Sequence, residues 1–227
     1  MFSSITSSAD RTAPPPQPVP FPAGLSLVKR LKVGETLFIE GEEARFCYLI
    51  VSGVVKEFTT LDDGQREISD FYAEGDIVGV SGHKRHMQTA EAVTEASVRR
   101  VPQDVLLRNP QNSAELSSYV MGLLVRRIDR SRQRAVMISR KSAHERLAGF
   151  LLMLAAESGQ SEIAISMSRQ DIADYLGLTI ESVCRILTDL RKSGAILMPR
   201  ARLFSIADSD LLKNAAGPDL VMRDTQN

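Results

Sequence analysis

The chain has 227 residues, 43% of them hydrophobic, and its 28 lysines and arginines balance 28 aspartates and glutamates, as is typical of a globular protein of one or two domains. No apolar run reaches the roughly 18 residues of a transmembrane helix, and no basic segment followed by an apolar one opens the chain, so we expect a cytoplasmic protein with no membrane association. Its two cysteines, Cys47 and Cys184, are too few for a disulfide scaffold or a four-cysteine metal site.

Residues 1–24 are rich first in serine and then in proline, as in APPPQPVPFPAG, and predict a disordered arm. Residues 25–112 alternate short β-prone runs with glycines, and Asp63-Gly64 between two of these runs is typical of a hairpin turn. The runs are TLFIE, FCYLIV, GVVKEF, REISDFY, DIVGV and ASVRRV. Many short strands at regular spacing predict an antiparallel β-roll.

Residues 113–139 change to a helical period and predict one long dimerisation helix. A second copy of the chain is expected to cover one apolar stripe, which has the spacing of a coiled-coil seam and consists of Met121, Leu124, Ile128, Ser131, Ala135 and Ile138. A second stripe lies on another face of the helix and fits packing on the β-roll; it consists of Leu116, Val120 and Leu123. The alternative is a helix that is simply buried in a monomer.

Residues 126–146 hold seven arginines and one lysine against Asp129 and Glu145. One interpretation is a solvated helix face, the usual place of a charge run. The other is a basic collar close to DNA. Because the arginines are spread around the helix, the sequence leaves both interpretations open.

Residues 140–212 predict a winged helix-turn-helix, with a flexible tail at 213–227. Its centre is RQDIADYLGLTIESVCRILT, in which the small Ala173 lets a second helix cross the first and Gly177 permits a left-handed turn. Thr179 is suited to cap the second helix. The segment AILMPRARLFSI then predicts two short strands placed around its proline, which would form the wing.

The second helix of such a unit enters the major groove of double-stranded DNA, where its N-terminal residues meet the edges of the bases. Val183 and Ile186 are expected to point inward, which leaves Glu181, Ser182 and Arg185 facing outward. Arg185 is suited to guanine, Glu181 to the amino group of cytosine, and Ser182 to a base or a phosphate. An ordinary surface pair between Glu181 and Arg185 is the alternative.

The start of the first helix supplies two further candidates for DNA contact. Ser168 resembles the cap of that helix, and Arg169 follows it directly. With the three outward residues of the second helix, they complete the predicted DNA-binding set.

The order of β-roll, long helix and winged helix-turn-helix, an α+β fold, resembles the cyclic-AMP receptor protein/FNR superfamily of bacterial transcription regulators over residues 25–210. The segments SRQDIADYLGLTIESVCRIL, AHERLAGFLL and EGDIVGV resemble its FixK branch. Of the E-x-x-S-R signature of FNR-type recognition helices, Glu181 and Arg185 are present and Cys184 replaces the serine. The resemblance implies a homodimer on palindromes of TTGAT-like half-sites that contacts RNA polymerase, mainly as an activator of genes for microaerobic respiration and nitrogen fixation.

Two departures from the superfamily bear on its cofactors. Cyclic-nucleotide binders carry a G-E…R-[ST]-A cassette, but the matching stretch here is Gly79-Val80…Gln88-Thr89-Ala90, so both charged anchors are gone and a phosphate would stay unpaired. FNR itself holds an iron–sulfur cluster through N-terminal cysteines, and residues 1–46 contain none. We therefore expect neither a nucleotide nor a metal cofactor.

Cys184 lies next to Arg185 and near a helix N-terminus, and both features lower the pKa of a thiol. One hypothesis is a redox-sensitive residue whose oxidation adds negative charge beside phosphate and lowers DNA affinity. The other is a small residue that fills the serine position. Cys47, inside FCYLIV, is expected to be a core thiol.

Two alternatives concern other functions, and one further expectation concerns a partner. A metal-dependent enzyme of the cupin type would need an H-x-H…E ligand set, which His83 and His86 do not supply, so no catalytic residue is expected. A regulator of the same fold that responds to a small molecule or to haem is the second alternative. The loop Leu61–Glu67 resembles the position at which relatives contact polymerase.

Overall fold

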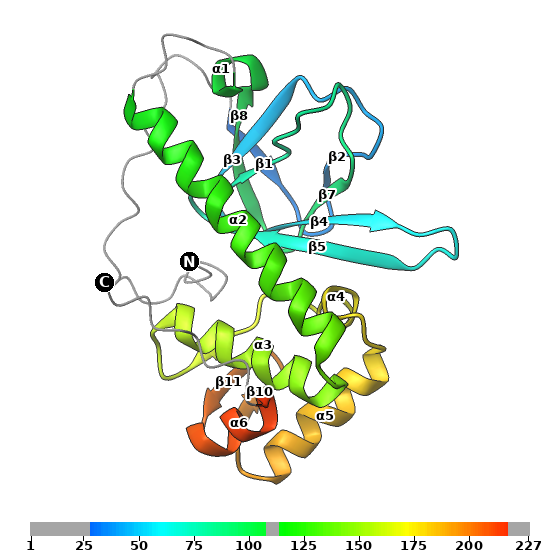
Figure 1. The fold of residues 1–227 in the computed structure, drawn as a ribbon, viewed down its shortest axis with the longest axis vertical. Helices are drawn as coiled ribbons and strands as arrows, with labels where there is room; N and C mark the ends of the chain where they lie inside the picture. Colours follow the sequence, from blue (N-terminus) through cyan, green and yellow to red (C-terminus); the bar gives the residue numbers. More distant parts are fainter. Residues whose placement is uncertain (1–27, 108–113, 218–227) are drawn as a thin grey trace. The chain divides into compact units, whose positions relative to one another are not determined.

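The computed structural model describes residues 28–107 and 114–217, which fall into two compact units, one up to Arg132 and the other from Gln133 (Figure 1). The division falls within the long helix α2 (Ala114–Arg140). The predicted arm at 1–24 and residues 218–227 of the predicted tail lie outside the described residues.

The first unit contains two four-stranded antiparallel sheets, with strand orders β1-β8-β3-β6 and β2-β7-β4-β5. This confirms the predicted antiparallel roll. The strands are β1 (Val28–Leu31), β2 (Thr36–Phe38), β3 (Phe46–Ser52), β4 (Val55–Thr60), β5 (Arg66–Tyr72), β6 (Ile77–Val78), β7 (Thr89–Ala92) and β8 (Ala96–Pro102), followed by the short helix α1 (Gln103–Leu107).

The predicted β-prone runs overlap β2, β3, β4, β5, β6 and β8. The hairpin turn between β4 and β5 is also present, since Gly64 has a φ of 81° and its amide donates to the carbonyl of Leu61. Strands β1 and β7 were not predicted. Strand β7 reads TAEA, which has low β propensity, and it is a strand because β2 and β4 pair with it from both sides.

Helix α2 covers the first unit with the stripe that the sequence assigned to this role. Leu116 and Val120 are buried together with Cys47, Leu49 and other side chains of β3, β6 and β8, and Leu123 packs against the same cluster. The prediction that this stripe faces the β-roll is therefore confirmed.

The second unit holds a three-stranded sheet in the order β10-β11-β9 and the helices around it. Ser142 caps α3 through a capping box with Glu145, and Gly159 ends the helix in the left-handed conformation. Its elements are α3 (Ala143–Ser158), β9 (Ile163–Ala164), α4 (Arg169–Leu176), α5 (Ile180–Lys192), β10 (Ile196–Arg200), β11 (Leu203–Ile206) and α6 (Ser209–Ala216).

The prediction of a flexible tail from residue 213 is wrong at its start. Lys213 to Ala216 belong to α6, which Asp208 caps and which packs on α3. Leu212 and Ala216, four residues apart on one helix face, are buried. The polar composition of the segment concealed this short apolar face.

Candidate nucleic-acid interface

The turn between α4 and α5 is built by local caps, as the sequence predicted. The Ser168 hydroxyl accepts from the amide of Asp171, and the Asp171 carboxylate accepts from the amide of Ser168, which together form a capping box at the start of α4. Gly177 ends α4 with a φ of 62°, and the Thr179 hydroxyl accepts from the amide of Ser182 at the start of α5. Two short helices are thereby held at a defined angle without a long loop.

The two faces of α5 separate as expected. Val183 and Ile186 are 0% and 2% exposed and pack inward, whereas Glu181, Cys184 and Arg185 are exposed and Ser182 is partly exposed. In the part of the chain that the structure describes, neither Glu181 nor Arg185 makes an ion pair or a side-chain hydrogen bond. The alternative of a Glu181–Arg185 surface pair is therefore not observed among the described residues.

Ser168 and Arg169 both make internal contacts, of which the sequence indicated only the capping contact of Ser168. The Ser168 hydroxyl donates to Asp171 at 2.6 Å and is occupied by its capping role. Arg169 donates from Nη2 to the carbonyl of Ala201 in the turn after β10, at 2.5 Å, and so ties the start of α4 to the wing. Any DNA contact by these two residues competes with those bonds.

Cys184 lies within the electrostatic reach of Arg169. Burial lowers the pKa of Arg169; Cys184 acts against that shift, and the Arg202 guanidinium acts with it. The exposed thiol therefore lies near the Arg169 guanidinium, which in turn lies near the exposed Arg202. Cys47, by contrast, is buried, and its burial raises the pKa of the thiol to about 12.

The wing is present, but its turn is not at Pro199. Strand β10 includes Pro199 and ends at Arg200, so the turn lies at Ala201 and Arg202. Proline has no N–H to donate to a ladder, and the register between β10 and β11 shifts between Leu197 and Arg200. The exposed cations Arg200 and Arg202 at this turn are candidate phosphate contacts that the sequence analysis did not name, although two arginines beside a predicted hairpin were a visible signal.

The outer face of α2 carries an exposed apolar stripe. Met121, Val125, Ile128 and Val136 are 62%, 49%, 58% and 52% exposed. Ser131 and Ala135 of the predicted seam are also exposed, and Ile138 is half-buried. Leu124 instead packs partly against the buried cluster of the first unit. The exposed stripe thus overlaps the predicted seam at Met121 and Ile128 and includes two valines that the seam omitted.

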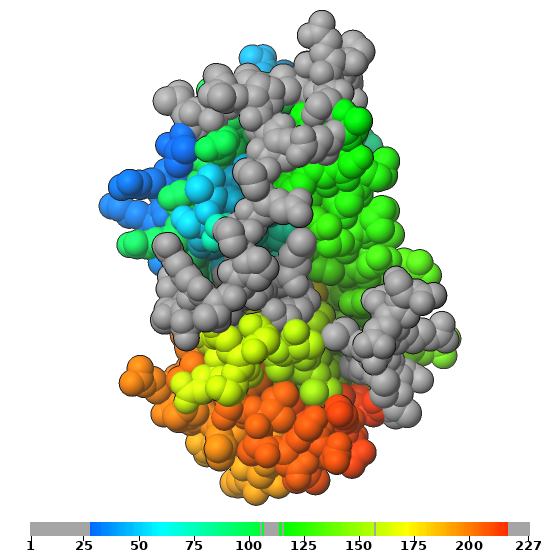
Figure 2. All heavy atoms as spheres, turned by 90° about the vertical axis from the view of Figure 1, so that its left-hand side faces the viewer, coloured from blue at the N-terminus to red at the C-terminus, as the bar shows by residue number. Residues whose placement is uncertain are grey.

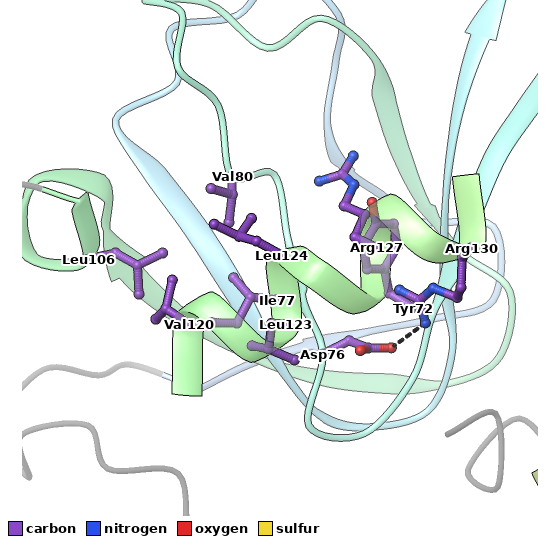
Figure 3. Close-up of a pocket in the computed structure, with 10 residues that line it drawn as sticks. All are labelled: Tyr72, Asp76, Ile77, Val80, Leu106, Val120, Leu123, Leu124, Arg127 and Arg130. Atoms are coloured by element: carbon purple, nitrogen blue, oxygen red, sulfur yellow. Dashed lines mark ion pairs between the residues drawn. The ribbon is translucent and has the colours of Figure 1, made fainter. Parts of the chain in front are cut away.

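Five of the eight cations of the basic segment 126–146 are engaged inside their own unit, which neither interpretation of that segment anticipated. In the first unit Arg127 pairs with Glu57 at 2.8 Å and Arg130 pairs with Asp70 at 3.1 Å. Arg130 also pairs with Asp76 at 3.6 Å (Figure 3). The second unit engages Arg134, Lys141 and Arg146 through backbone carbonyls. The spread of arginines around the helix therefore reflects internal partners for these five cations, whereas Arg132 and Arg140 are exposed.

A cavity of about 160 Å³ lies at the stretch that corresponds to the nucleotide cassette of cyclic-nucleotide binders, lined by Gly79, Gln88, His86, Glu57 and Arg127 among others. Glu57 is 4% exposed. Its carboxylate accepts from the Tyr72 hydroxyl at 2.5 Å, from the Gly79 amide at 3.2 Å and from Arg127. The guanidinium that reaches this cavity is thus already paired with a carboxylate of the chain. A second cavity of about 20 Å³ beside it is mainly apolar (Figure 3).

The histidines considered for metal binding do not gather with other ligands. His86 stacks on Phe38 with ring centroids 3.8 Å apart, and burial lowers its pKa. Within residues 28–107 and 114–217, no three His, Cys, Asp or Glu side chains form a group suited to a metal ion. Every helix in these residues is too short or too polar to cross a lipid bilayer.

The chain matches two known domain families. Residues 28–111 match the cyclic nucleotide-binding domain, and residues 145–215 match the Crp-like helix-turn-helix domain. The second match contains α4, α5 and the wing. In the space-filling view, the orange atoms of α5 and the wing lie at the surface of this unit (Figure 2).

Curated relatives and solved structures agree with these matches. The chain is 36% identical to the nitrogen fixation regulation protein FixK of Azorhizobium caulinodans, over 91% of this chain and 84% of that protein. It is 34% identical to the fumarate nitrate reduction regulatory protein of Klebsiella oxytoca, over 83% of this chain and 78% of that protein. The structure of FixK2 from Bradyrhizobium japonicum superposes with a TM-score of 0.79 at 29% identity and covers 86% of this chain and 98% of that chain.

Proposed function

The chain belongs to the cyclic-AMP receptor protein/FNR family of transcription regulators, on its FixK branch, and from this premise we propose that it binds palindromes of TTGAT-like half-sites as a homodimer. The family consists of regulators, not enzymes. The observation that carries the proposal is the outer face of α5, where Glu181 and Arg185 are exposed above the buried Val183 and Ile186. An unpaired carboxylate in an anionic groove is costly unless it reads a base.

The proposed readout assigns one group to each base of a G·C pair. A TTGAT half-site contains a single G·C pair, which offers guanine O6 and N7 to Arg185 and the cytosine amino group to Glu181. Ser182, whose hydroxyl already accepts from Thr179, is assigned to a phosphate or base beside them. Ser168 and Arg169 are assigned to the backbone, where the wing cations Arg200 and Arg202 would support them.

The dimer is proposed on the exposed stripe of α2, because a two-fold palindrome calls for a two-fold protein. Four apolar side chains about half exposed or more on one helix face are typical of an interface. Activation would further need a contact to RNA polymerase, for which the exposed turn Leu61–Glu67 is the candidate. We place the protein in the cytoplasm, as a regulator of microaerobic respiration and nitrogen fixation, in line with the names of its relatives.

Control through Cys184 is supported by its exposure on the proposed DNA face and by the Arg169 guanidinium near it. Oxidation to an acid places a negative charge beside phosphate. Two like charges about 4 Å apart repel by roughly 1 kcal/mol in water and about 4 kcal/mol at an effective dielectric of 20. The proposed DNA affinity would therefore fall at least several-fold on oxidation, without a bound cofactor.

In the native protein, a thiol reagent is expected to modify Cys184 and leave Cys47 intact, because only Cys184 is exposed and burial raises the pKa of Cys47. Mass spectrometry after native and denaturing labelling measures the two sites. Peroxide is expected to weaken DNA binding of the wild type but not of Cys184→Ala. Equal loss in both proteins would remove Cys184 from the mechanism.

A regulator that responds to a small molecule or haem remains the second candidate, favoured by the 160 Å³ cavity of the first unit. We propose that DNA binding needs no small-molecule effector, because the Arg127 guanidinium at this cavity is already paired with Glu57.

Selection from random-sequence DNA by the purified protein, with no small molecule added, tests the main proposal. We expect enrichment of a palindrome with TTGAT-like half-sites, bound by two chains as measured by sedimentation. Enrichment only after addition of a small molecule would favour the second candidate, and no enrichment in any condition would contradict both.

A further inference from the structure

The C-terminal end of α4 is held by two arginines from other helices. Arg134 of α2 donates from Nε to the carbonyl of Tyr175 at 2.9 Å and lies over the Tyr175 ring, 5.2 Å from its centroid. Arg146 of α3 donates from Nη1 to the carbonyls of Leu176 at 3.1 Å and Gly177 at 3.3 Å. Three successive carbonyls at the end of the helix are thus bound by guanidinium groups.

Arg146 also binds the end of α2. Its Nη2 donates to the carbonyl of Ile138 at 2.6 Å, and its Nε donates to the carbonyl of Lys141 at 3.0 Å. One planar side chain, itself near the start of α3, therefore joins the last turn of α2 to the last turn of α4. All of these residues belong to the second unit.

These bonds have a clear physical basis. The last carbonyls of a helix have no partner within it and carry partial negative charge, so a cation at that end both satisfies and stabilises them. Guanidinium is suited to this role, because its five N–H groups lie in one plane with fixed directions. Lysine has one ammonium and cannot reach carbonyls of two separate helix ends at once.

The held carbonyls directly precede the recognition helix. Gly177 is the left-handed residue that ends α4, and Thr179, two residues later, is the cap of α5. With so short a turn, a shift of the Leu176 and Gly177 carbonyls displaces the start of α5, which carries Glu181 and Arg185.

We propose that Arg146, assisted by Arg134, is a positioning residue for DNA recognition, which holds the start of α5 in a fixed orientation to the end of α2. The inference rests on the proposed function. In a dimer joined through α2, this orientation determines the separation of the two recognition helices, which must match half-sites about 34 Å apart. The contribution of Arg146 is therefore to half-site spacing and not to charge.

A direct contact between Arg146 and phosphate is the rival explanation, and the two differ in their dependence on salt and sequence. Loss of a phosphate contact weakens binding to all sequences and lowers the salt slope by about 1. Loss of a positioning bond weakens binding to the specific site and leaves the salt slope and non-specific affinity unchanged.

The test compares Arg146→Gln, Arg146→Lys and Arg134→Gln with Arg140→Gln, an exposed arginine in the same segment. DNA affinity is measured on the selected palindrome, on the same palindrome lengthened by one base pair, which rotates one half-site by about 35°, and on unrelated DNA. For Arg146→Gln we expect about tenfold weaker binding to the palindrome, equivalent to about 1.4 kcal/mol, and a reduced preference for the correct spacing. Arg140→Gln is expected to keep the wild-type preference.

The conservative variant separates geometry from charge. Arg146→Lys is expected to behave as Arg146→Gln does. Arg134→Gln is expected to weaken specific binding as well, and the double variant with Arg146→Gln should lose less than the sum of the two single losses, because both arginines hold one helix end. Wild-type affinity and spacing preference in Arg146→Lys, or an equal loss on all three DNAs in Arg146→Gln, would overturn the proposal.

Hydrogen exchange on free protein provides a readout that does not depend on DNA. In Arg146→Gln and Arg134→Gln, the amides of Leu178 and Val183, which are bonded to the carbonyls of Ala173 and Thr179, are expected to exchange faster than in wild type, while α6 is unchanged. Unchanged exchange in both variants would contradict the proposal that Arg146 and Arg134 hold the end of α4. If wild type selects no DNA site, the proposed function fails, and this measurement still decides whether the arginines hold the turn.

Discussion

Arg185→Ala is expected to abolish sequence-specific DNA binding while non-specific binding persists. A bidentate contact between arginine and guanine is worth about 1–3 kcal/mol of base discrimination. Because a dimer makes the contact twice, the loss reaches about 2–6 kcal/mol, or roughly 30-fold to more than 10⁴-fold in affinity. Arg185 is exposed and pairs with no other described residue, so the substitution disturbs little of the free protein. Fluorescence anisotropy on the selected palindrome and on unrelated DNA measures both affinities.

Arg191→Ala is the matched control, since Arg191 is an exposed cation in the last turn of the same helix. It should reduce affinity for all DNA modestly and leave the preference for the palindrome intact. Glu181→Ala should relax discrimination at the G·C pair with little change in the salt slope, because no cation is removed. Equal effects of the two arginine substitutions on specific binding would contradict the assignment of Arg185 as a base contact.

Arg127→Met is expected to destabilise the first unit by about 3–5 kcal/mol, because it leaves the Glu57 carboxylate buried without its charged partner. Glu57 is 4% exposed, and its remaining donors are the Tyr72 hydroxyl and the Gly79 amide. Chemical denaturation measures the change. The chain has no tryptophan, so tyrosine fluorescence, to which Tyr72 contributes from within this cluster, is the suitable signal.

Two further variants test whether the buried charge is the cause. Arg132→Met replaces an exposed arginine of the same helix and should change stability little. Glu57→Met combined with Arg127→Met removes both charges and should recover much of the loss, since no carboxylate is then left unpaired in the interior. A double variant less stable than Arg127→Met alone would show that the pair contributes more than mutual neutralisation.

At the neighbouring pair of Asp70 and Arg130, burial and ion pairing shift the carboxyl pKa in opposite directions. Burial raises the pKa of Asp70 to about 6, and Arg130 acts against that shift. A carboxyl group whose pKa is raised by folding stabilises the fold most at low pH, and that stabilisation is lost as pH rises toward 6. Arg130 therefore limits a cost of burial at neutral pH and does not add a large net stabilisation.

The sequence by itself determined the elements whose signals are local. The capping residues Ser168 and Thr179, the left-handed Gly177 and the inward Val183 and Ile186 all lie where their chemistry predicts. Each acts within one turn of its own position, so neighbouring residues suffice to specify it. The alternation of β-prone runs likewise predicted the roll, because period and turn chemistry are properties of short segments.

Only the tertiary structure decided the features whose partners are distant in sequence. Arg127 finds Glu57, Arg130 finds Asp70, and Arg146 finds the carbonyls at the end of α4. Three other features depend in the same way on what packs against them: the strand character of β7, the partial burial of Leu124, and helix α6, which overlaps the start of the expected tail. A guanidinium at a given helical position is chemically the same whether it meets water, phosphate or a buried carboxylate. Its role is therefore decided by contacts that a local pattern does not contain.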